Sequence, residues 1–451
     1  MLPTGFLSLA LPLVFGVAGA LDIDVNSADS IKSAAKTFAD SIVTFYNSRL
    51  EGQAVGIFDD PYFFWEDGAA WNALIEYSSL TGDKQYNKIV AAALNAQSSD
   101  DLNFMPPNQT KTLGNDDQAV WALAALTAAD TGFGEKPASG EWIDYAKNVF
   151  DNQVLRWDDT SCGGGLKWQI FSFNSGYNYK NSLTNGAFFL LSSRLALATG
   201  NKTYSDWAEK SFEWAKTIGL VSDTYSVYDG TDDQMNCSQI NHIQWSWDLG
   251  VYTEGAAALY NFTNGDSKWK DAVTGFANAG TVFQDESTKV LSEVACESNG
   301  KCDTDQRAFK GLLARSLARA AVYAPFVASN LTPAVQASGK AAAAACSGKG
   351  VNLKCGMKWT EANESKDVTS VKENGLSEAL SAFEAVQALL YANAPTGAIP
   401  ANGTTTNAPS GSPTASKTGN AQPAQGTGAA GKVAAAGGVA CMAGLFAILM
   451  I

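Results

Sequence analysis

The sequence predicts an all-α domain built as an (α/α)6 toroid, a closed ring of six helical hairpins. A turn sequence recurs as LTGDKQY at 80–86, ATGNKTY at 198–204 and FTNGDSKW at 262–269. Each copy follows a stretch rich in small residues and precedes apolar residues spaced by three and four, which is typical of two helices joined through a glycine C-cap. The pattern fills a core of residues 21–394 without an internal linker. Long-period repeats of helical pairs form solenoids or closed toroids.

When the repeated pattern is extended along the chain, the hairpins are expected to open with six helices, at about 65–80, 116–130, 181–199, 247–261, 305–323 and 375–393. Five of these helices are followed by a partner, and a first helix at 26–47 supplies the partner of the last. The opening helices contain runs of Gly and Ala that allow close packing in an inner ring, whereas their partners are amphipathic and suit an outer ring. The matching first and last helices favour closure over an open array.

The N-terminal segment has the pattern of a secretory signal peptide. Residues 1–20 are apolar and end in Ala18-Gly19-Ala20, a small-x-small sequence that signal peptidase accepts. The mature chain is therefore expected to start near Leu21.

The C-terminal segment has the pattern of a GPI-attachment signal. Residues 395–432 are rich in Gly, Pro, Ser, Thr, Asn and Ala and are expected to be a disordered linker, and residues 433–451 form an apolar tail with no basic residues after it. Gly419 or Asn420 is the expected attachment residue. A simple tail-anchoring span is the alternative. In either case we expect the protein on the outer face of the plasma membrane or in the cell wall.

Six cysteines remain once Cys441 leaves with the tail, an even number that suggests three disulfides in an oxidising compartment. Short spacings favour Cys296 with Cys302 and Cys346 with Cys355, which leaves Cys162 for Cys237, although fifteen connectivities are possible. Glycosylation sequons are also frequent, and each would place its asparagine on the surface if used; they begin at Asn108, Asn201, Asn236, Asn261, Asn330, Asn363 and Asn402.

The charge and the histidine count exclude several classes of function. A net charge of -14 argues against nucleic acid and anionic lipid as partners, because both require a basic footprint. His242 is the single histidine, so neither a Ser-His-Asp triad nor a multi-histidine metal site can be assembled. We expect no metal and no cofactor, an uncharged ligand and a monomeric protein, with His242 in a structural role.

Loops before the inner helices are expected to meet in one cleft, because the chain enters every inner helix from the same face. These loops are rich in aromatics, carboxylates and amides, a mixture that suits carbohydrate. Five tryptophans lie near these helix starts, and each could either contact a sugar or pack in the hydrophobic core. They are Trp65, Trp71, Trp121, Trp245 and Trp247.

The stretch GNDDQAVW at 114–121 places Asp116 and Asp117 at a helix start. Cleavage of a glycosidic bond needs two carboxyl groups, about 5 Å apart for retention and about 6.5 to 9.5 Å apart for inversion. Adjacent residues reach the shorter distance, so the pair predicts a retaining enzyme. The helix N-terminus stabilises one ionised carboxylate, and the neighbouring charge keeps the other protonated. A plain helix N-cap is the structural alternative.

A second Asp-Asp occurs in GTDDQMNC at 230–237, where no helical period follows. We expect a loop pinned by Cys237. The roles of Asp232 and Asp233 stay unassigned.

The motifs YFFWEDGAAW, GNDDQAVWAL, YKNSLTNGAFFLLSSRLA, VYDG, QWSWDLGVYTEGAAALY and DQRAFKGLLARSLA together resemble glycoside hydrolase family 76, the endo-α-1,6-mannanases. They run in order over about residues 25–392, and the signal peptide, cysteines and GPI tail resemble the fungal cell-wall branch. The resemblance implies an (α/α)6 barrel and a retaining mechanism.

The resemblance also implies roles for individual residues. Asp116 is expected to be the nucleophile and Asp117 the acid/base. Asp229 of VYDG matches an acidic cleft position, and Trp65, Asn181 and Trp247 match aromatic and amide positions near the cleft. The implied reaction is cleavage of an α-mannoside, with the GPI-core glycan as donor and transfer of the attached protein to cell-wall β-glucan.

Two other functions stay open. The barrel could be a catalytically silent mannan-binding protein of the cell wall, or it could belong to another (α/α)6 glycosidase family, which usually inverts. Asparagine variants of the pair, and the anomeric configuration of the first product, distinguish these functions.

Overall fold

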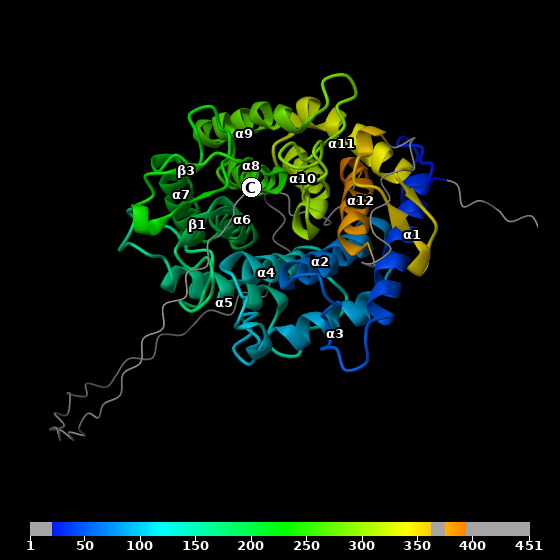
Figure 1. Cartoon of the computed structure of the whole chain (residues 1–451), viewed down its shortest axis with the longest axis horizontal. Coiled ribbons are helices and arrows are strands. Elements are labelled where there is room, and N and C mark those ends of the chain that lie inside the picture. Colours follow the sequence, from blue (N-terminus) through cyan, green and yellow to red (C-terminus); the bar gives the residue numbers. More distant parts are fainter. Residues whose placement is uncertain (1–19, 362–374, 394–451) are drawn as a thin grey trace, which may run out of the picture. The chain divides into compact units, whose positions relative to one another are not determined.

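The computed structural model describes residues 20–361 and 375–393. Twelve α-helices in this part of the chain form two concentric rings (Figure 1). The inner ring is closed, because each helix contacts the next and the last returns to the first; it consists of α2 (Phe64–Thr81), α4 (Asn115–Asp130), α6 (Ser182–Thr199), α8 (Ser246–Phe262), α10 (Thr304–Tyr323) and α12 (Leu376–Ala388). The predicted all-α toroid is confirmed.

The outer ring consists of α1 (Ala28–Asn47), α3 (Asn87–Gln97), α5 (Trp142–Leu155), α7 (Lys202–Thr217), α9 (Ser267–Ala279) and α11 (Ala328–Ala344). As predicted, α1 packs on α12 and so completes the last hairpin. The repeated turn ends α2 and α6 at Gly82 and Gly200, both in the left-handed conformation that glycine adopts without strain, with φ of 82° and 70°.

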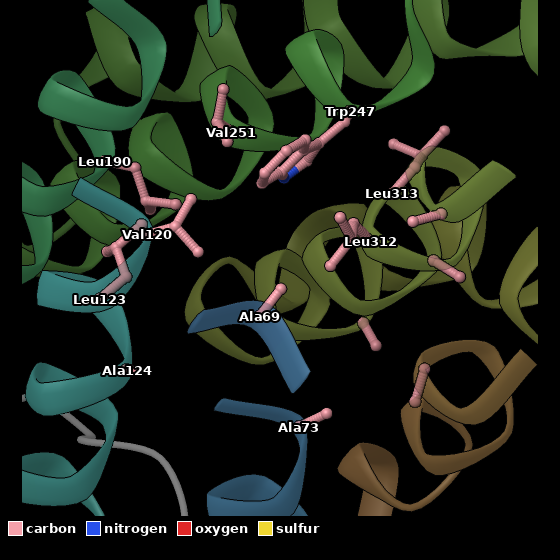
Figure 2. Packing of buried hydrophobic residues seen from close by; sticks show 14 of the residues in the cluster. Ala69, Ala73, Val120, Leu123, Ala124, Leu190, Trp247, Val251, Leu312 and Leu313 are labelled. Carbon is pink, nitrogen blue, oxygen red and sulfur yellow. The ribbon is translucent and has the colours of Figure 1, made fainter. Parts of the chain in front are cut away.

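Small residues bring the inner helices close together. A Cβ on Gly311 of α10 would lie 2.2 Å from the carbonyl oxygen of Ser381 on α12, so only glycine allows this contact. On the ring axis, alanine, valine and leucine side chains from several helices meet the indole of Trp247 (Figure 2). The inner helices are therefore buried nearly all round, whereas their outer partners bury one face.

Short strands and 3-10 turns, none of which the sequence predicted, connect the helices. One antiparallel sheet comprises β1 (Tyr179–Asn181), β2 (Gly230–Asp232) and β3 (Ile240–Asn241), and another comprises β4 (Cys346–Ser347) and β5 (Lys354–Cys355). The 3-10 turns are η1 (Pro107–Gln109), η2 (Asp233–Met235), η3 (Gly280–Phe283), η4 (Pro325–Val327), η5 (Gly350–Asn352), η6 (Trp359–Glu361) and η8 (Tyr391–Asn393). The segment at 230–237, expected to be a loop, is a strand and a 3-10 turn.

Three disulfides join the cysteines as predicted: Cys162 with Cys237, Cys296 with Cys302, and Cys346 with Cys355. The first spans 75 residues and ties the β2–η2 segment to the loop after α5. The other two close loops of 6 and 9 residues.

A buried ring of charges lies toward the C-terminal ends of the inner helices, and all six helices contribute to it. Its members are Glu76, Asp130, Arg194, Glu254, Arg315, Arg319 and Glu384. Arg319 links two helices beyond its own, with its guanidinium 3.2 Å from Glu76 and 2.7 Å from Glu254. The opposite face of the barrel, where the inner helices begin, carries the cleft.

The expected signal peptide (except Ala20), the linker, the GPI signal and two sequons lie outside the described residues. Of the other sequons, Asn108, Asn201, Asn236 and Asn330 are exposed. Asn261 is only half-exposed, and its amide joins α8 to the end of α10 by donating to the Tyr323 carbonyl (3.2 Å). No helix among the described residues is long and apolar enough to cross a membrane.

Candidate active site

A cavity of about 510 Å³, which we call the cleft, opens where the inner helices begin. Its lining combines seven aromatic side chains, five carboxyls and four amides: Phe63, Phe64, Trp65, Trp168, Tyr179, Trp245, Phe309, Asp116, Asp117, Asp229, Asp248, Asp305, Gln169, Asn174, Asn181 and Gln306. This is the composition expected of a carbohydrate site, in which aromatic faces cover sugar C–H groups and carboxyls and amides bind hydroxyls.

The first turn of α4 holds Asp116 and Asp117 in the cleft, both 7% exposed. Asp117 is tied down by two backbone donors, because its Oδ2 accepts from the N–H of Gly114 (2.7 Å) and its Oδ1 from the N–H of Trp65 on α2 (3.1 Å). Asp116 Oδ1 accepts from the N–H of Asp117 (2.9 Å). Neither aspartate is the N-cap of α4, which is Gly114; Asp117 is the N3 residue, and its carboxyl completes a capping box by accepting from the Gly114 N–H. Asp117 therefore caps the helix start and also lines the cleft.

Gly114 brings the two carboxyls together. A Cβ at this position would lie 2.2 Å from Asp116 Oδ1 and 2.9 Å from Asp117 Oδ2, so these two oxygens are at most about 5 Å apart, within the range of retaining glycosidases. Gly114 has an ordinary φ of -92°. Its lack of a side chain therefore serves the contact with the carboxyls and not a special backbone conformation.

Burial raises the pKa of both carboxyls, to about 6 for Asp116 and well above the usual value for Asp117. Hydrogen bonds from the N–H of Asp117 and from the side chains of Asn181 and Thr184 lower the pKa of Asp116 and so oppose the effect of burial. The negative charges of Asp116 and Asp305 raise the pKa of Asp117 further. In the pair, therefore, Asp117 is the one that retains a proton to higher pH, and the main cause is burial rather than the neighbouring charge alone.

Asp305, in the first turn of α10, connects α10 with α2, two inner helices that are separated in the ring by α12. Its Oδ1 accepts from Trp65 Nε1 (2.9 Å), a bond between residues 240 positions apart. Burial raises its pKa to about 6. The bond fixes the Trp65 indole on the cleft surface.

Asp229 lies just before β2 and lines the cleft, as expected. Its carboxyl accepts from three side chains: Trp245 Nε1 (2.8 Å), Asn241 Nδ2 (2.9 Å) and the Tyr179 hydroxyl. It therefore orients two of the aromatic rings that line the cleft.

Asp248, in the first turn of α8, was not among the predicted site residues. It is 2% exposed and lines the cleft. Burial, followed by the charges of Asp229, Glu293 and Asp116, raises its pKa well above the usual value. A signal existed in the sequence, since α2, α4, α8, α10 and α12 all have an acidic residue in the first turn.

First-turn acids do not all face the cleft, however. Glu66 on α2 accepts from the hydroxyl of Ser377 on α12 (2.6 Å), and Asp67 accepts from the N–H of Phe58 (3.0 Å). Both carboxyls are buried and stabilise the closure of the ring and the loop before α2.

The predicted binding residues occupy different layers. Trp65 and Asn181 line the cleft, and Asn181 also caps α6 by accepting from the N–H of Thr184 (3.1 Å). Trp247 lies behind that surface, 2% exposed, with its ring 4.7 Å from the Trp65 ring. Trp245, the residue before α8, lines the cleft instead.

Of the remaining aromatics near the helix starts, Trp71 and Trp121 are fully buried core residues. His242 is exposed and packs edge-on against Tyr228, with ring centroids 4.5 Å apart. In the described residues, no group of three or more His, Cys, Asp or Glu side chains is arranged to hold a metal ion.

The second Asp-Asp sequence, Asp232 and Asp233, does not line the cleft with the first. Asp233 pairs with Lys167, and Asp232 caps η2 by accepting from the N–H of Gln234 (2.8 Å). Lys167 is connected to the first pair through the backbone, because its carbonyl accepts from Asn115 Nδ2 (2.8 Å). The Asp-Asp sequences at 116–117 and 232–233 are therefore not two copies of one site.

Comparison with known proteins places the chain in a family. The model of glycosyl hydrolase family 76 matches residues 30–400. Mannan endo-1,6-alpha-mannosidase DCW1 of Saccharomyces cerevisiae is 41% identical over 343 residues, which cover 75% of this chain and 76% of that protein. Mannan endo-1,6-alpha-mannosidase DFG5 of the same yeast is 36% identical over 394 residues, covering 86% of this chain and 84% of that protein.

Solved structures agree with this placement. Dfg5 from Chaetomium thermophilum, in complex with glucosamine, superposes with a TM-score of 0.77 at 34% identity, covering 85% of this chain and 94% of that one. The alpha-1,6-mannanase GH76A of Salegentibacter sp. HEL1_6, as an inactive variant in complex with alpha-1,6-mannotriose, has a TM-score of 0.62 at 18% identity, covering 80% and 99%, and shares the fold. The resemblance seen in the sequence is confirmed, and this chain belongs to glycosyl hydrolase family 76.

Proposed function

We propose that this protein is a retaining glycosidase of the mannan endo-1,6-α-mannosidase type, with Asp116 and Asp117 as its catalytic residues. One observation carries the proposal: two adjacent carboxyls with oxygens at most about 5 Å apart face an aromatic-lined cleft. Family membership and relatives named mannan endo-1,6-alpha-mannosidase support an α-1,6-linked mannoside as substrate.

The surroundings of the pair support different roles for its two members. Asp116 has the lower pKa of the two and supplies the ionised nucleophile that attacks the anomeric carbon. Asp117 retains its proton and donates it to the leaving glycosidic oxygen. In the second half-reaction the Asp117 carboxylate accepts the proton of the incoming hydroxyl, and the bond between the sugar and Asp116 breaks.

The incoming hydroxyl decides between hydrolysis and transfer, because water and a sugar hydroxyl can both resolve the glycosyl-enzyme. We propose that the donor is the mannose-containing core glycan of a GPI anchor and that cell-wall β-glucan is the acceptor. The predicted signal peptide and GPI signal support a location on the outer face of the plasma membrane or in the cell wall. Asp229, Trp65 and Asn181 are proposed to contact the bound sugar, directly at the cleft surface.

NMR of the first product formed from an α-1,6-mannoside tests the mechanism. Retention gives the α-anomer first, whereas an initial β-anomer would show that Asp116 is not a nucleophile. Asp116→Asn is expected to abolish turnover and Asp117→Asn to reduce it about 10²- to 10⁴-fold, and both variants should preserve mannoside binding. Full activity in both variants would contradict the assignment of the pair. If the wild-type protein binds mannoside and never cleaves it, the barrel is a mannan-binding cell-wall protein instead.

A further inference from the structure

The start of α8 has no capping side chain of its own. Its N-cap is Trp245, which is extended and offers the helix no acceptor, whereas Asn181 caps α6 and the third residue of α2, α4 and α10 accepts from its own N-cap. The Trp245 indole instead lines the cleft and donates to Asp229 (2.8 Å). A residue that suits the cleft thus occupies the position where Ser, Thr, Asn or Asp would normally accept from the first N–H groups of a helix.

The missing acceptor comes from Glu293, a fully buried residue between η3 and α10, 47 positions after Ser246. Its Oε1 and Oε2 lie 3.2 Å and 3.4 Å from the backbone nitrogen of Ser246, the first residue of α8, and Oε2 also bonds to the Ser246 hydroxyl. Burial raises the pKa of Glu293 to about 8, so the carboxyl is mostly protonated at neutral pH. It therefore holds the helix start by hydrogen bonds rather than by charge.

Glu293 is itself fixed within residues 293–302, which we call the capping segment. Its N–H donates to Glu297 Oε2 (2.7 Å), and its carbonyl accepts from the N–H of Glu297 (2.9 Å). Glu297 Oε2 also accepts from Nζ of Lys310, a buried residue of α10 (2.8 Å). The acceptor at the start of α8 is therefore tied to the next inner helix.

The capping segment also supports the cleft through a second contact. The Trp245 ring packs against a small apolar cluster that contains the disulfide of the segment, Cys296–Cys302. Asp248 follows in the first turn of α8 and lines the cleft as well. Two side chains of the cleft thus depend on where and how α8 begins.

We propose that Glu293 is a positioning residue of the active site, which fixes the first turn of α8 and thereby holds Trp245 and Asp248 at the cleft. For its substrate the inference rests on the proposed function above. Glu293 is not part of the cleft lining, so it acts through α8 and not by contact with the sugar. Without this acceptor the first turn can fray, and small misplacements of groups at a reacting centre have effects up to about 10².

Three variants separate positioning from plain stability. Glu293→Met keeps a similar volume and removes the acceptor. Glu293→Gln keeps an oxygen that accepts from Ser246 and is neutral, as the protonated carboxyl is. Glu384→Met is the matched control, because Glu384 is equally buried, has a pKa raised by burial to about 8 and lies in the buried ring of charges on the opposite face of the barrel.

We expect Glu293→Met to raise the KM for an α-1,6-mannoside about tenfold or more and to change kcat less. Amide hydrogen exchange should become faster in this variant at residues 246–250, at the start of α8, and not across the barrel. Glu293→Gln should stay close to wild type in both measurements. Glu384→Met should lower the melting temperature without changing the KM or the exchange at 246–250.

A double-mutant cycle tests whether Glu293 acts through the cleft residues. The effects of Glu293→Met and Trp245→Ala on KM should be less than additive, since both variants remove the same positioned ring, and Asp248→Asn should couple in the same way. Glu384→Met should be additive with each of them.

Two results would overturn the assignment. If folded Glu293→Met has the KM and the exchange at 246–250 of the wild type, Glu293 does not hold α8. If its effect on KM is additive with those of both Trp245→Ala and Asp248→Asn, it does not act through them. Should Glu293→Met fail to fold, Ser246→Ala, which removes only the hydroxyl bond, gives the same comparison with a smaller effect. Failure of the proposed function is distinguishable, because wild-type protein would then cleave no α-1,6-mannoside, while exchange at 246–250 would still report on Glu293.

Discussion

The backbone N–H of Asp117 donates to Oδ1 of Asp116 over 2.9 Å, so the second residue of the pair holds the carboxyl of the first. Since Asp117 is itself held by the N–H groups of Gly114 and Trp65, neither carboxyl depends on a flexible partner. Both are preorganised before a substrate arrives, which is the condition for efficient proton transfer and nucleophilic attack.

Asp117→Ala should separate the acid role from the nucleophile role. On an α-1,6-mannoside we expect a loss of about 10²- to 10⁴-fold in kcat, the usual contribution of a general acid. An aryl mannoside with a good leaving group needs no protonation, so its glycosylation rate should fall far less. Steady-state rates on both substrates check this. An equal loss on the two would mean that Asp117 is not the acid.

The pH dependence of kcat/KM should be bell-shaped. Asp116 must be ionised, and because its pKa is raised to about 6, activity should fall as the pH drops below that value. Asp117 must be protonated, and because its pKa is raised further, the alkaline limb lies at higher pH. The two limbs belong to the coupled pair. An acid limb near pH 4 would mean that the carboxyl is not desolvated in solution.

Asp116→Asn should stabilise the protein while inactivating it. A buried carboxyl whose pKa rises from 3.8 to about 6 favours the folded state at low pH and loses that contribution as the pH rises through this window. The variant should therefore gain about 1 to 3 kcal/mol at pH 7, and less than about 1 kcal/mol at pH 4. Urea unfolding at the two pH values measures the difference. A destabilised variant at pH 7 would contradict this account.

Gly114→Ala should damage activity more than stability. The new methyl would overlap Asp116 Oδ1, at 2.2 Å, whereas the backbone φ of -92° accepts alanine. We expect kcat/KM to fall at least about tenfold, since small misplacements of reacting groups have effects up to about 10². Gly134→Ala is the matched control, because a Cβ there meets nothing within 4 Å. Equal kinetics in the two variants would exclude close contact at Gly114.

Arg319→Met should be strongly destabilising. The change removes the guanidinium that contacts both Glu76 and Glu254, and breaking a buried ion pair on one side costs about 3 to 5 kcal/mol. Lys202→Met serves as control, since its pair with Asp206 is exposed and contributes at most about 1 kcal/mol. Melting temperatures compare the two. A similar, small shift in both would show that the buried ring contributes little.

Much of the fold could be predicted from the sequence, because outer helices such as α1, α7 and α9 carry an apolar period, the inner helices are rich in small apolar residues, and their turns repeat. The disulfides followed from short spacings and elimination. Strands of two or three residues, such as β3 and β1, are too short to show a period and were not predicted.

The site was predicted less completely, for a geometric reason. Asp116 and Asp117 stand out as a pair, but whether a single residue faces the cleft depends on where its helix begins. Trp245 is the extended residue before α8 and reaches the cleft, whereas Trp247, in the first turn of α8, is directed to the buried ring axis (Figure 2). Asp248 and Asp305 escaped prediction because isolated first-turn aspartates equally suit a helix N-terminus.

The bond between Trp65 and Asp305 has a consequence for the time at which the protein can act. A chain synthesised only as far as α8 already contains both aspartates of α4, yet it lacks Asp305, the residue that fixes the Trp65 indole 240 positions earlier. The cleft is complete only after α10 has joined the ring. A partly synthesised chain is thus without a finished cleft surface, although it already holds both carboxyls of the pair.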